Sequence, residues 1–174
     1  MEASKAITRQ GWTAFALAAA VIVFDQLTKL WVVHGLGMTR PGNKIELSPI
    51  FDLTMVWNRG VSFGFAGDHG ALSRWGFTIF ALIVAAVVGD WARRNTKPSL
   101  AICFGLLMGG AIGNAIDRFR LGYVVDFLDF SGAYFPWVFN IADAAITVGA
   151  VFILYEAFWP LVRERLESAR VRGN

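Results

Sequence analysis

The stretch WTAFALAAAVIVFDQLTKLWVV, residues 12–33, is the clearest indication of the fold class of this chain. It is almost entirely apolar, and it is long enough to cross the hydrocarbon core of a bilayer, which takes about 20 residues in a helix. Its second half nevertheless carries Asp25, Gln26, Thr28 and Lys29. The stretch therefore predicts a membrane-spanning helix that places ionisable side chains at membrane depth.

The rest of the chain has the composition of a membrane protein. Of its 174 residues, 56% are hydrophobic and 17% are charged, whereas soluble domains are about one quarter charged. Three further apolar blocks lie at about residues 75–91, 99–116 and 139–159. We therefore predict an all-α membrane protein, one domain over residues 1–174, with four transmembrane helices and a small β-sheet on its outer face. The first block continues past Ala20 with no polar segment, which disfavours a cleaved signal peptide.

The basic residues predict the orientation. They cluster before the first block, between the second and third blocks, and after the fourth. Lysine and arginine are enriched in cytoplasmic loops, so we expect both termini in the cytoplasm. This clustering at block ends also explains the net charge of +3 without nucleic acid as a partner. Membrane lipids are the expected surroundings.

The first outward segment, about residues 40–68, predicts a small antiparallel sheet. Apolar and polar residues alternate over 45–48 and 51–57, and a third alternating stretch, 61–65, follows Gly60. Glycines in such a sheet let a ligand approach the backbone closely. A structural cap over the helices and a cradle for an extended peptide are equally compatible with this pattern.

Polar residues recur at the outward ends of the predicted helices. Asp25 lies in the first block, Asn114 and Asp117 close the third, and Asn140 and Asp143 open the fourth. Ionisable residues at membrane depth are costly and usually face a cavity, pair with partners and have a function. We therefore expect these residues to converge on one functional site.

Each residue also has a structural interpretation. Asn140 and Asp143 have the spacing of a helix cap. Asp25 and Lys29 have the spacing of an ion pair on one helix face. Asp117 could pair with its neighbours Arg118 and Arg120. Asp126 and Asp129 could be ordinary loop residues.

Two converging carboxylates would support peptide hydrolysis. Like charges held close together cannot both ionise easily, so one carboxyl keeps its proton. The ionised member can then accept a proton from an attacking water, while the protonated member donates to the developing oxyanion. Spacing alone does not choose the pair among Asp117, Asp126, Asp129 and Asp143.

A proton-coupled transporter is the main alternative use of such an acidic cluster. The chain is small, however, and its two halves show no internal repeat of the kind that many transporters have. The acids also cluster at one end of the helices. A purely structural adaptor would leave the polar cluster without a purpose.

Five motifs, in this order, resemble those of the lipoprotein signal peptidases, also called signal peptidase II. They are DQLTK at 25–29, NRGVSFG at 58–64, GNAIDR at 113–118, VVDF at 124–127 and FNIAD at 139–143. The resemblance spans nearly the whole region from the first to the fourth helix.

This resemblance implies an aspartic endopeptidase of the bacterial inner membrane with its active site near the periplasmic face. Such an enzyme cleaves signal peptides from diacylglyceryl-modified prolipoproteins and leaves a lipid-modified cysteine at the mature N-terminus. It implies no cofactor and no metal, a monomer, and a mobile flap over about residues 118–138. The implied catalytic pair is Asp126 and Asp143, and the implied supporting residues are Asp25, Asn58, Gly60, Asn114, Arg118 and Asn140.

Overall fold

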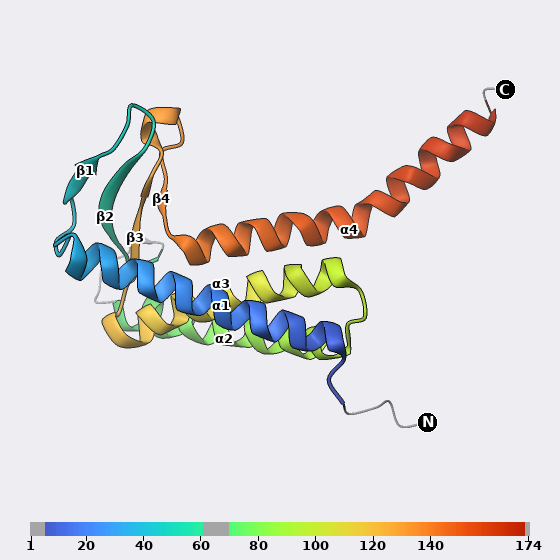
Figure 1. Ribbon diagram of the computed structural model, residues 1–174, viewed down its shortest axis with the longest axis horizontal. Helices are drawn as coiled ribbons and strands as arrows, with labels where there is room; N and C mark the ends of the chain where they lie inside the picture. The colour runs from blue at the N-terminus through green and yellow to red at the C-terminus, as the bar shows by residue number, and fades with distance from the viewer. Residues whose placement is uncertain (1–5, 61–69, 173–174) are drawn as a thin grey trace.

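The computed structural model describes residues 6–60 and 70–172, and four long helices make up most of it (Figure 1). They are α1 (Arg9–Leu30), α2 (Gly70–Arg94), α3 (Pro98–Leu121) and α4 (Ile141–Arg172), and a π-helical turn, η1 (Trp31–Gly35), extends α1. Each helix contains a segment long and apolar enough to cross a membrane, which confirms the four predicted spans. The second and third spans are longer than the apolar blocks indicated, because polar residues such as Arg74 and Asp117 continue the helices.

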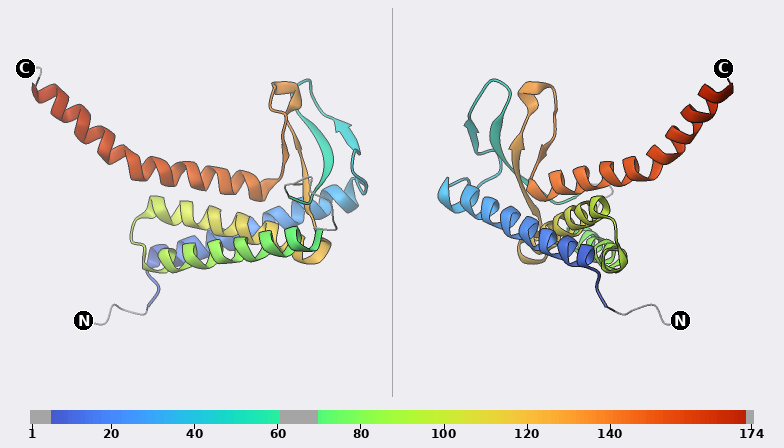
Figure 2. Two further views of the ribbon diagram at one scale, coloured as in Figure 1. Left: turned by 180° about the vertical axis from the view of Figure 1, so that it is seen from behind. Right: turned by 45° about the vertical axis from the view of Figure 1, so that its right-hand side comes forward.

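Helix α3 lies at the centre of the helical bundle. It packs against α1, α2 and α4 (Figures 1 and 2). Within its apolar segment 61% of the residues are buried in the protein, compared with 22% or less in the other three helices. The other helices therefore expose most of their apolar surface, as expected where hydrocarbon surrounds them.

Glycines on α3 bring its neighbours close. A Cβ atom at Gly109 would lie 2.6 Å from the Cβ of Val21, and Gly105, one turn earlier, faces α1 in the same way. One turn later, a Cβ at Gly113 would lie 2.9 Å from a carboxylate oxygen of Asp25. Small residues four apart allow two membrane helices to approach at backbone distance. This spacing therefore positions α1, together with Asp25, against α3.

An antiparallel sheet lies at one end of the helices. Its four strands follow the order β1 (Lys44–Glu46), β2 (Asp52–Asn58), β3 (Val124–Asp129) and β4 (Val138–Phe139). The first two strands confirm the predicted sheet, while the alternating stretch 61–65 lies outside the described residues. Below the sheet, Met55 and Phe127 pack with Val32 of η1 in a second apolar core.

The segment expected to form a flap, 118–138, is for the most part regular structure. Helix α3 continues to Leu121, and β3 pairs with β2 along most of its length. Asp126 thus lies in a strand and not in a loop. Five of the six residues of β3 are buried, so the strand lacks the apolar–polar alternation by which β1 and β2 could be recognised.

The start of α1 and the end of α4 lie at the opposite end of the helices from the sheet (Figure 1). The short connection between α2 and α3 lies there too. Helix α4 runs through Pro160 to Arg172 and bends in its C-terminal part, as a proline inside a helix favours. The arrangement places the end of α1, the end of α3 and the start of α4 together beneath the sheet.

We expect Gly109→Val to destabilise the protein by about 1–3 kcal/mol, because the added side chain would collide with Val21 and the backbone of α1. Thermal unfolding in detergent micelles measures this. Gly76→Ala on α2 is the matched control, because nothing lies within 4 Å of the Cβ position at Gly76. Equal effects of the two substitutions would contradict the packing role of Gly109.

Candidate active site

A buried cation lies between two buried carboxylates at the base of the site. Lys29 Nζ on α1 is 2.8 Å from Asp25 Oδ2 and 2.8 Å from Asp117 Oδ2. Gln26 Nε2 donates a further hydrogen bond to Asp117 Oδ1 at 2.9 Å. The predicted pair of Asp25 and Lys29 is therefore present. The suggested pairing of Asp117 with neighbouring arginines is wrong, since its partner lies on α1.

The two carboxylates of this ion cluster also hold the backbone of other elements. Asp25 Oδ1 accepts a hydrogen bond from the backbone N–H of Ala142 at 3.0 Å. Asp117 Oδ2 accepts one from the backbone N–H of Val125 at 3.1 Å. Ala142 immediately precedes Asp143, and Val125 immediately precedes Asp126. The cluster therefore positions the chain at both predicted catalytic residues.

Asn114 connects the ion cluster to Asp143. Its Oδ1 accepts hydrogen bonds from Lys29 Nζ at 3.3 Å and from Asn140 Nδ2 at 3.1 Å. With the amide oxygen held in this way, its Nδ2 donates to Asp143 Oδ1 at 2.7 Å. The lysine thus determines which end of the Asn114 amide faces Asp143.

Asn140 caps α4 and joins the two predicted catalytic residues. Its Oδ1 accepts a hydrogen bond from the backbone N–H of Asp143 at 2.9 Å, and its own backbone N–H donates to Asp143 Oδ2 at 3.3 Å. This is the helix cap suggested by the sequence spacing. The same side chain also donates to Asp126 Oδ1, from Nδ2, at 2.6 Å. The structural and the functional interpretation of Asn140 are therefore compatible.

The side chain of Asp126, a residue of β3, is buried. Only 1% of it is exposed, and its Oδ2 accepts a hydrogen bond from Asn58 Nδ2 at 2.9 Å. Burial raises the pKa of Asp126 to about 7, and the nearby charge of Asp143 adds to this rise, while the hydrogen bonds from Asn58 and Asn140 oppose it. Asp126 therefore keeps a proton at a pH where an ordinary aspartate has lost it.

Gly60 holds Asn58 in the orientation that faces Asp126. The backbone N–H of Gly60 donates to Asn58 Oδ1 at 2.9 Å, which leaves the amide nitrogen of Asn58 pointing toward the carboxylate. Gly60 has a φ of +88°, and a Cβ there would collide with the ring of Phe77. Conformation and space both require glycine at this position.

Asp129, the other acid of β3, belongs to the sheet. Its Oδ2 accepts from Thr54 Oγ1 at 2.6 Å, and its Oδ1 accepts from the backbone N–H of Ser131 at 2.9 Å. These bonds, the one from Thr54 above all, hold the pKa of Asp129 below its usual range. Of the four acids that the sequence left open, only Asp126 and Asp143 share hydrogen bonds with Asn140.

Arg118 lies beside the pair without bonding to it. Its guanidinium lies 5.3 Å from the centroid of the Phe77 ring, and it makes no ion pair with another described residue. The carboxylates that act on it electrostatically are Asp143, Asp126 and Asp117. Arg118 therefore supplies positive charge near the pair and keeps its donors for another group.

The structure brings most of the predicted site residues into one hydrogen-bonded network. Asp25, Asn58, Asn114, Asn140 and both predicted catalytic residues belong to it, Gly60 supports it and Arg118 borders it. The predicted set omitted Lys29, Gln26 and Asp117. A lysine within an apolar helix, four residues after an aspartate, was the sequence signal for their role.

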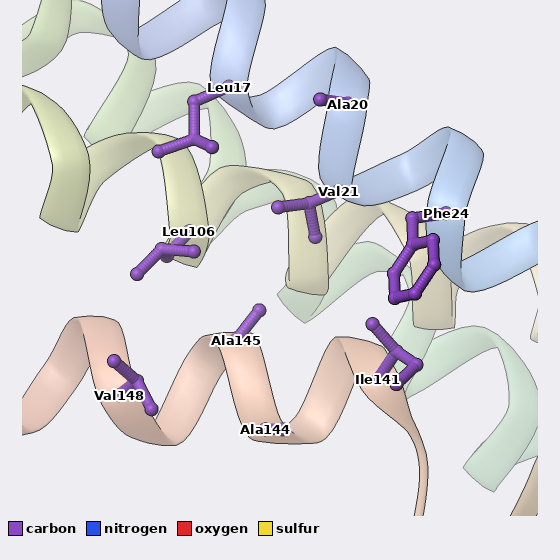
Figure 3. Close-up of a pocket in the computed structure, with 9 residues that line it drawn as sticks. All are labelled: Leu17, Ala20, Val21, Phe24, Leu106, Ile141, Ala144, Ala145 and Val148. Atoms are coloured by element: carbon purple, nitrogen blue, oxygen red, sulfur yellow. The ribbon is translucent and has the colours of Figure 1, made fainter.

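An apolar groove of about 390 Å³ lies on the bilayer side of the network, between α1 and α4, with Leu106 of α3 at its floor (Figure 3). Phe24 and Ile141 line its end nearest the polar residues. Every lining side chain is a hydrocarbon. A hydrocarbon chain in this groove would therefore contact Phe24, the residue that precedes Asp25.

Comparison with known proteins identifies relatives along nearly the whole chain. Residues 17–159 match the family described as signal peptidase (SPase) II. The lipoprotein signal peptidase of Caulobacter vibrioides is 48% identical over 156 residues, which are 89% of this chain and 92% of that protein. That of Methylorubrum extorquens is 42% identical over 89% of this chain and 90% of its own length. A solved bacterial membrane enzyme superposes with a TM-score of 0.71 at 28% identity, covering 89% of this chain and 97% of that one.

We expect Lys29→Met to destabilise the protein by about 3–5 kcal/mol, because it leaves two buried carboxylates without their cation. Thermal unfolding in detergent provides the measurement. Lys44→Met is the matched control, because Lys44 pairs with Asp52 at 2.9 Å but is 43% exposed, and solvent screens such surface pairs so that they contribute little to stability. A Lys29→Met protein as stable as the control would show that the ion cluster does not hold the site together.

Proposed function

The chain belongs to the signal peptidase II family, and we propose that it removes signal peptides from lipid-modified prolipoproteins with Asp126 and Asp143 as an aspartic catalytic pair. The observation that carries this proposal is Asn140, whose side chain bonds both residues of the pair. The family match supports the substrate class, and the hydrogen-bonded network supports the choice of these two aspartates.

In this proposal one carboxyl group is protonated and the other is ionised. Asp126, whose pKa is about 7, is the protonated member. Asp143 is the ionised member, because it lies in the first turn of α4, where the helix dipole favours negative charge, and accepts from Asn114.

Hydrolysis then follows a general acid–base course. The Asp143 carboxylate accepts a proton from a water molecule as the water oxygen attacks the scissile carbonyl carbon. Asp126 donates its hydrogen bond, and then its proton, to the carbonyl oxygen. When the tetrahedral intermediate collapses, the C–N bond breaks and the amine of the new N-terminal cysteine takes the proton that Asp143 had accepted, while a hydroxyl proton of the intermediate returns to Asp126. No covalent intermediate with the enzyme forms.

The position of the pair suits a substrate anchored in the bilayer. Asp143 lies in the first turn of α4, and Asn140 links it to Asp126 on β3, so the scissile bond would lie at the level of the helix ends. A lipid on the substrate cysteine could stay in the membrane while the bond is cut. Arg118, with its donors unengaged by the described carboxylates, is positioned to bond the substrate backbone.

We further propose that the protein is a multi-pass inner-membrane monomer with both termini in the cytoplasm and the pair near the periplasmic face. The arginines and lysines at the end of the helices opposite the sheet support this orientation. The transporter alternative gains no support, since the matching family and relatives are peptidases.

Asp126→Asn and Asp143→Asn should each lower the cleavage rate of a diacylated precursor by on the order of 10²- to 10⁴-fold, because each removes one proton-transfer group. Purified protein in detergent or liposomes, with a non-lipidated precursor alongside, provides the assay. Asp129→Asn is the matched control and should keep most activity, because Asp129 bonds the sheet and not the pair.

Thermal unfolding must accompany this assay, because an asparagine at 126 cannot accept from both Asn58 and Asn140, and one of these amides has to turn. Wild-type turnover by a folded Asp126 or Asp143 variant would refute the pair. Equal losses in all three variants would mean that Asp129 has a catalytic role.

The rate should also fall as the pH rises through about 7. Below this pH Asp126 holds its proton, and above it the proton is lost, so kcat/KM should decrease about tenfold per pH unit on the alkaline side. A zwitterionic detergent keeps surface charge from shifting the profile. A rate that is constant from pH 6 to pH 9 would exclude Asp126 as the proton donor.

A further inference from the structure

The end of the sheet farthest from the helices carries an exposed apolar surface. It is formed by the β1–β2 and β3–β4 connections, which contact each other: a side chain at Gly132 would collide with the carbonyl of Pro49. We call this surface the apolar tip, and it consists of Leu47, Ile50, Tyr134, Phe135 and Trp137.

The apolar tip has an unusual composition for a loop region in water. Tyr134 is 99% exposed and Trp137 is 68% exposed, and the aliphatic residues of the tip are more than half exposed. Neither segment that forms the tip, residues 47–51 and 130–138, contains a charged residue. Contiguous exposed apolar surface of this kind marks a contact with a partner or a membrane.

The backbone conformation of one residue of the tip, Tyr134, indicates that its side chain has a function. Tyr134 has a φ of +61°, in the left-handed region, and it is the one described residue other than glycine with a positive φ. Such a position favours glycine or asparagine, and a bulky residue there is retained only where something else requires it. Because Tyr134 is fully exposed, packing within the protein does not provide that reason.

The arrangement of the sheet indicates what the tip meets. The sheet runs across the helices and not along them, and it reaches sideways past the start of α4 (Figures 1 and 2). In both figures the tip stays at the level where α1 ends and α4 begins. Because the helices are long and apolar enough to cross a membrane, the sheet extends in the direction of the membrane plane, beside α4, and not along the helix axes into the aqueous phase.

We propose that the apolar tip inserts into the headgroup region of the bilayer on the side of the sheet and anchors the sheet there. Tryptophan and tyrosine favour this region, because their rings are apolar and their N–H and O–H groups can stay hydrated. Trp31, which is 56% exposed at the start of η1, marks the same interface at the helix end. The partner is thus a lipid surface, and the contact needs no substrate.

The anchor would also fix the depth of β3, the strand that joins the tip to Asp126. This consequence for catalysis rests on the proposed function, whereas the anchor itself does not. The experiment therefore measures membrane contact and not cleavage.

The test uses cysteine labelling with an environment-sensitive fluorophore. In a Cys103→Ala background, Tyr134→Cys places the probe on the tip, and Thr39→Cys places it on the exposed loop before β1 as the matched control. The labelled proteins are reconstituted in vesicles of phosphatidylethanolamine and phosphatidylglycerol. Quenching by aqueous iodide is compared with quenching by a nitroxide attached to the lipid headgroup region.

We expect the probe at 134 to be quenched at least severalfold more by the lipid nitroxide than by iodide, and the probe at 39 to show the reverse. In an Ile50→Cys protein, the added substitutions Tyr134→Ser and Trp137→Ser should raise quenching by iodide. Equal iodide quenching at 134 and 39 would overturn the proposal. So would protection that appears only when a precursor peptide is added, or only at high protein-to-lipid ratios, because the tip would then bind substrate or a second copy.

Discussion

Lys29 binds Asp25 and Asp117 at 2.8 Å each, in a part of the protein where all three side chains are buried. A charge at membrane depth requires a partner, and in this ion cluster Lys29, Asp25 and Asp117 each have one. Its carboxylates bond the backbone of α4 and of β3, while Lys29 bonds Asn114 on α3. One ion cluster centred on a lysine of α1 thus connects α1, α3, α4 and β3, and the site is completed by Asn58 of β2. The glycines of α3 are also required, because they allow α1 to approach closely enough for the ion pairs to form.

Three asparagine side chains orient the catalytic pair, and one of them, Asn114, connects it to this ion cluster. Each amide has one oxygen and one nitrogen, so a donor that occupies the oxygen determines where the nitrogen points. Lys29 orients Asn114 in this way, the backbone of Asp143 orients Asn140, and Gly60 orients Asn58. The nitrogens then face the carboxylates of Asp126 and Asp143. Neutral donors hold the two carboxyl groups near each other without adding a cation between them, so burial and the charge of Asp143 can raise the pKa of Asp126.

The sequence predicted the four spans, the first two strands and the convergence of polar residues, because apolar block length and alternation are local signals. Strand β3 could not be recognised, because nearly all of its residues are buried and its partner β2 lies far away in the chain. For the same reason Asp126 was expected in a loop. Lys29 was predicted as a partner of Asp25, four residues away, but its bond to Asp117 joins residues on different helices and depends on the packing of α1 on α3. The choice between Asp126 and Asp129 likewise depends on their surroundings, since both are acids of one strand.

We infer that Asp126 carries a proton near neutral pH because the hydrogen-bonded network buries it beside Asp143. Infrared spectroscopy of the purified protein measures this directly, since a protonated carboxyl group has a carbonyl band distinct from that of a carboxylate. We expect such a band at pH 6 that disappears as the pH rises through about 7, is absent from Asp126→Asn and persists in Asp129→Asn. A spectrum without this band at pH 6, or one in which the band survives in Asp126→Asn, would show that Asp126 is not the protonated group.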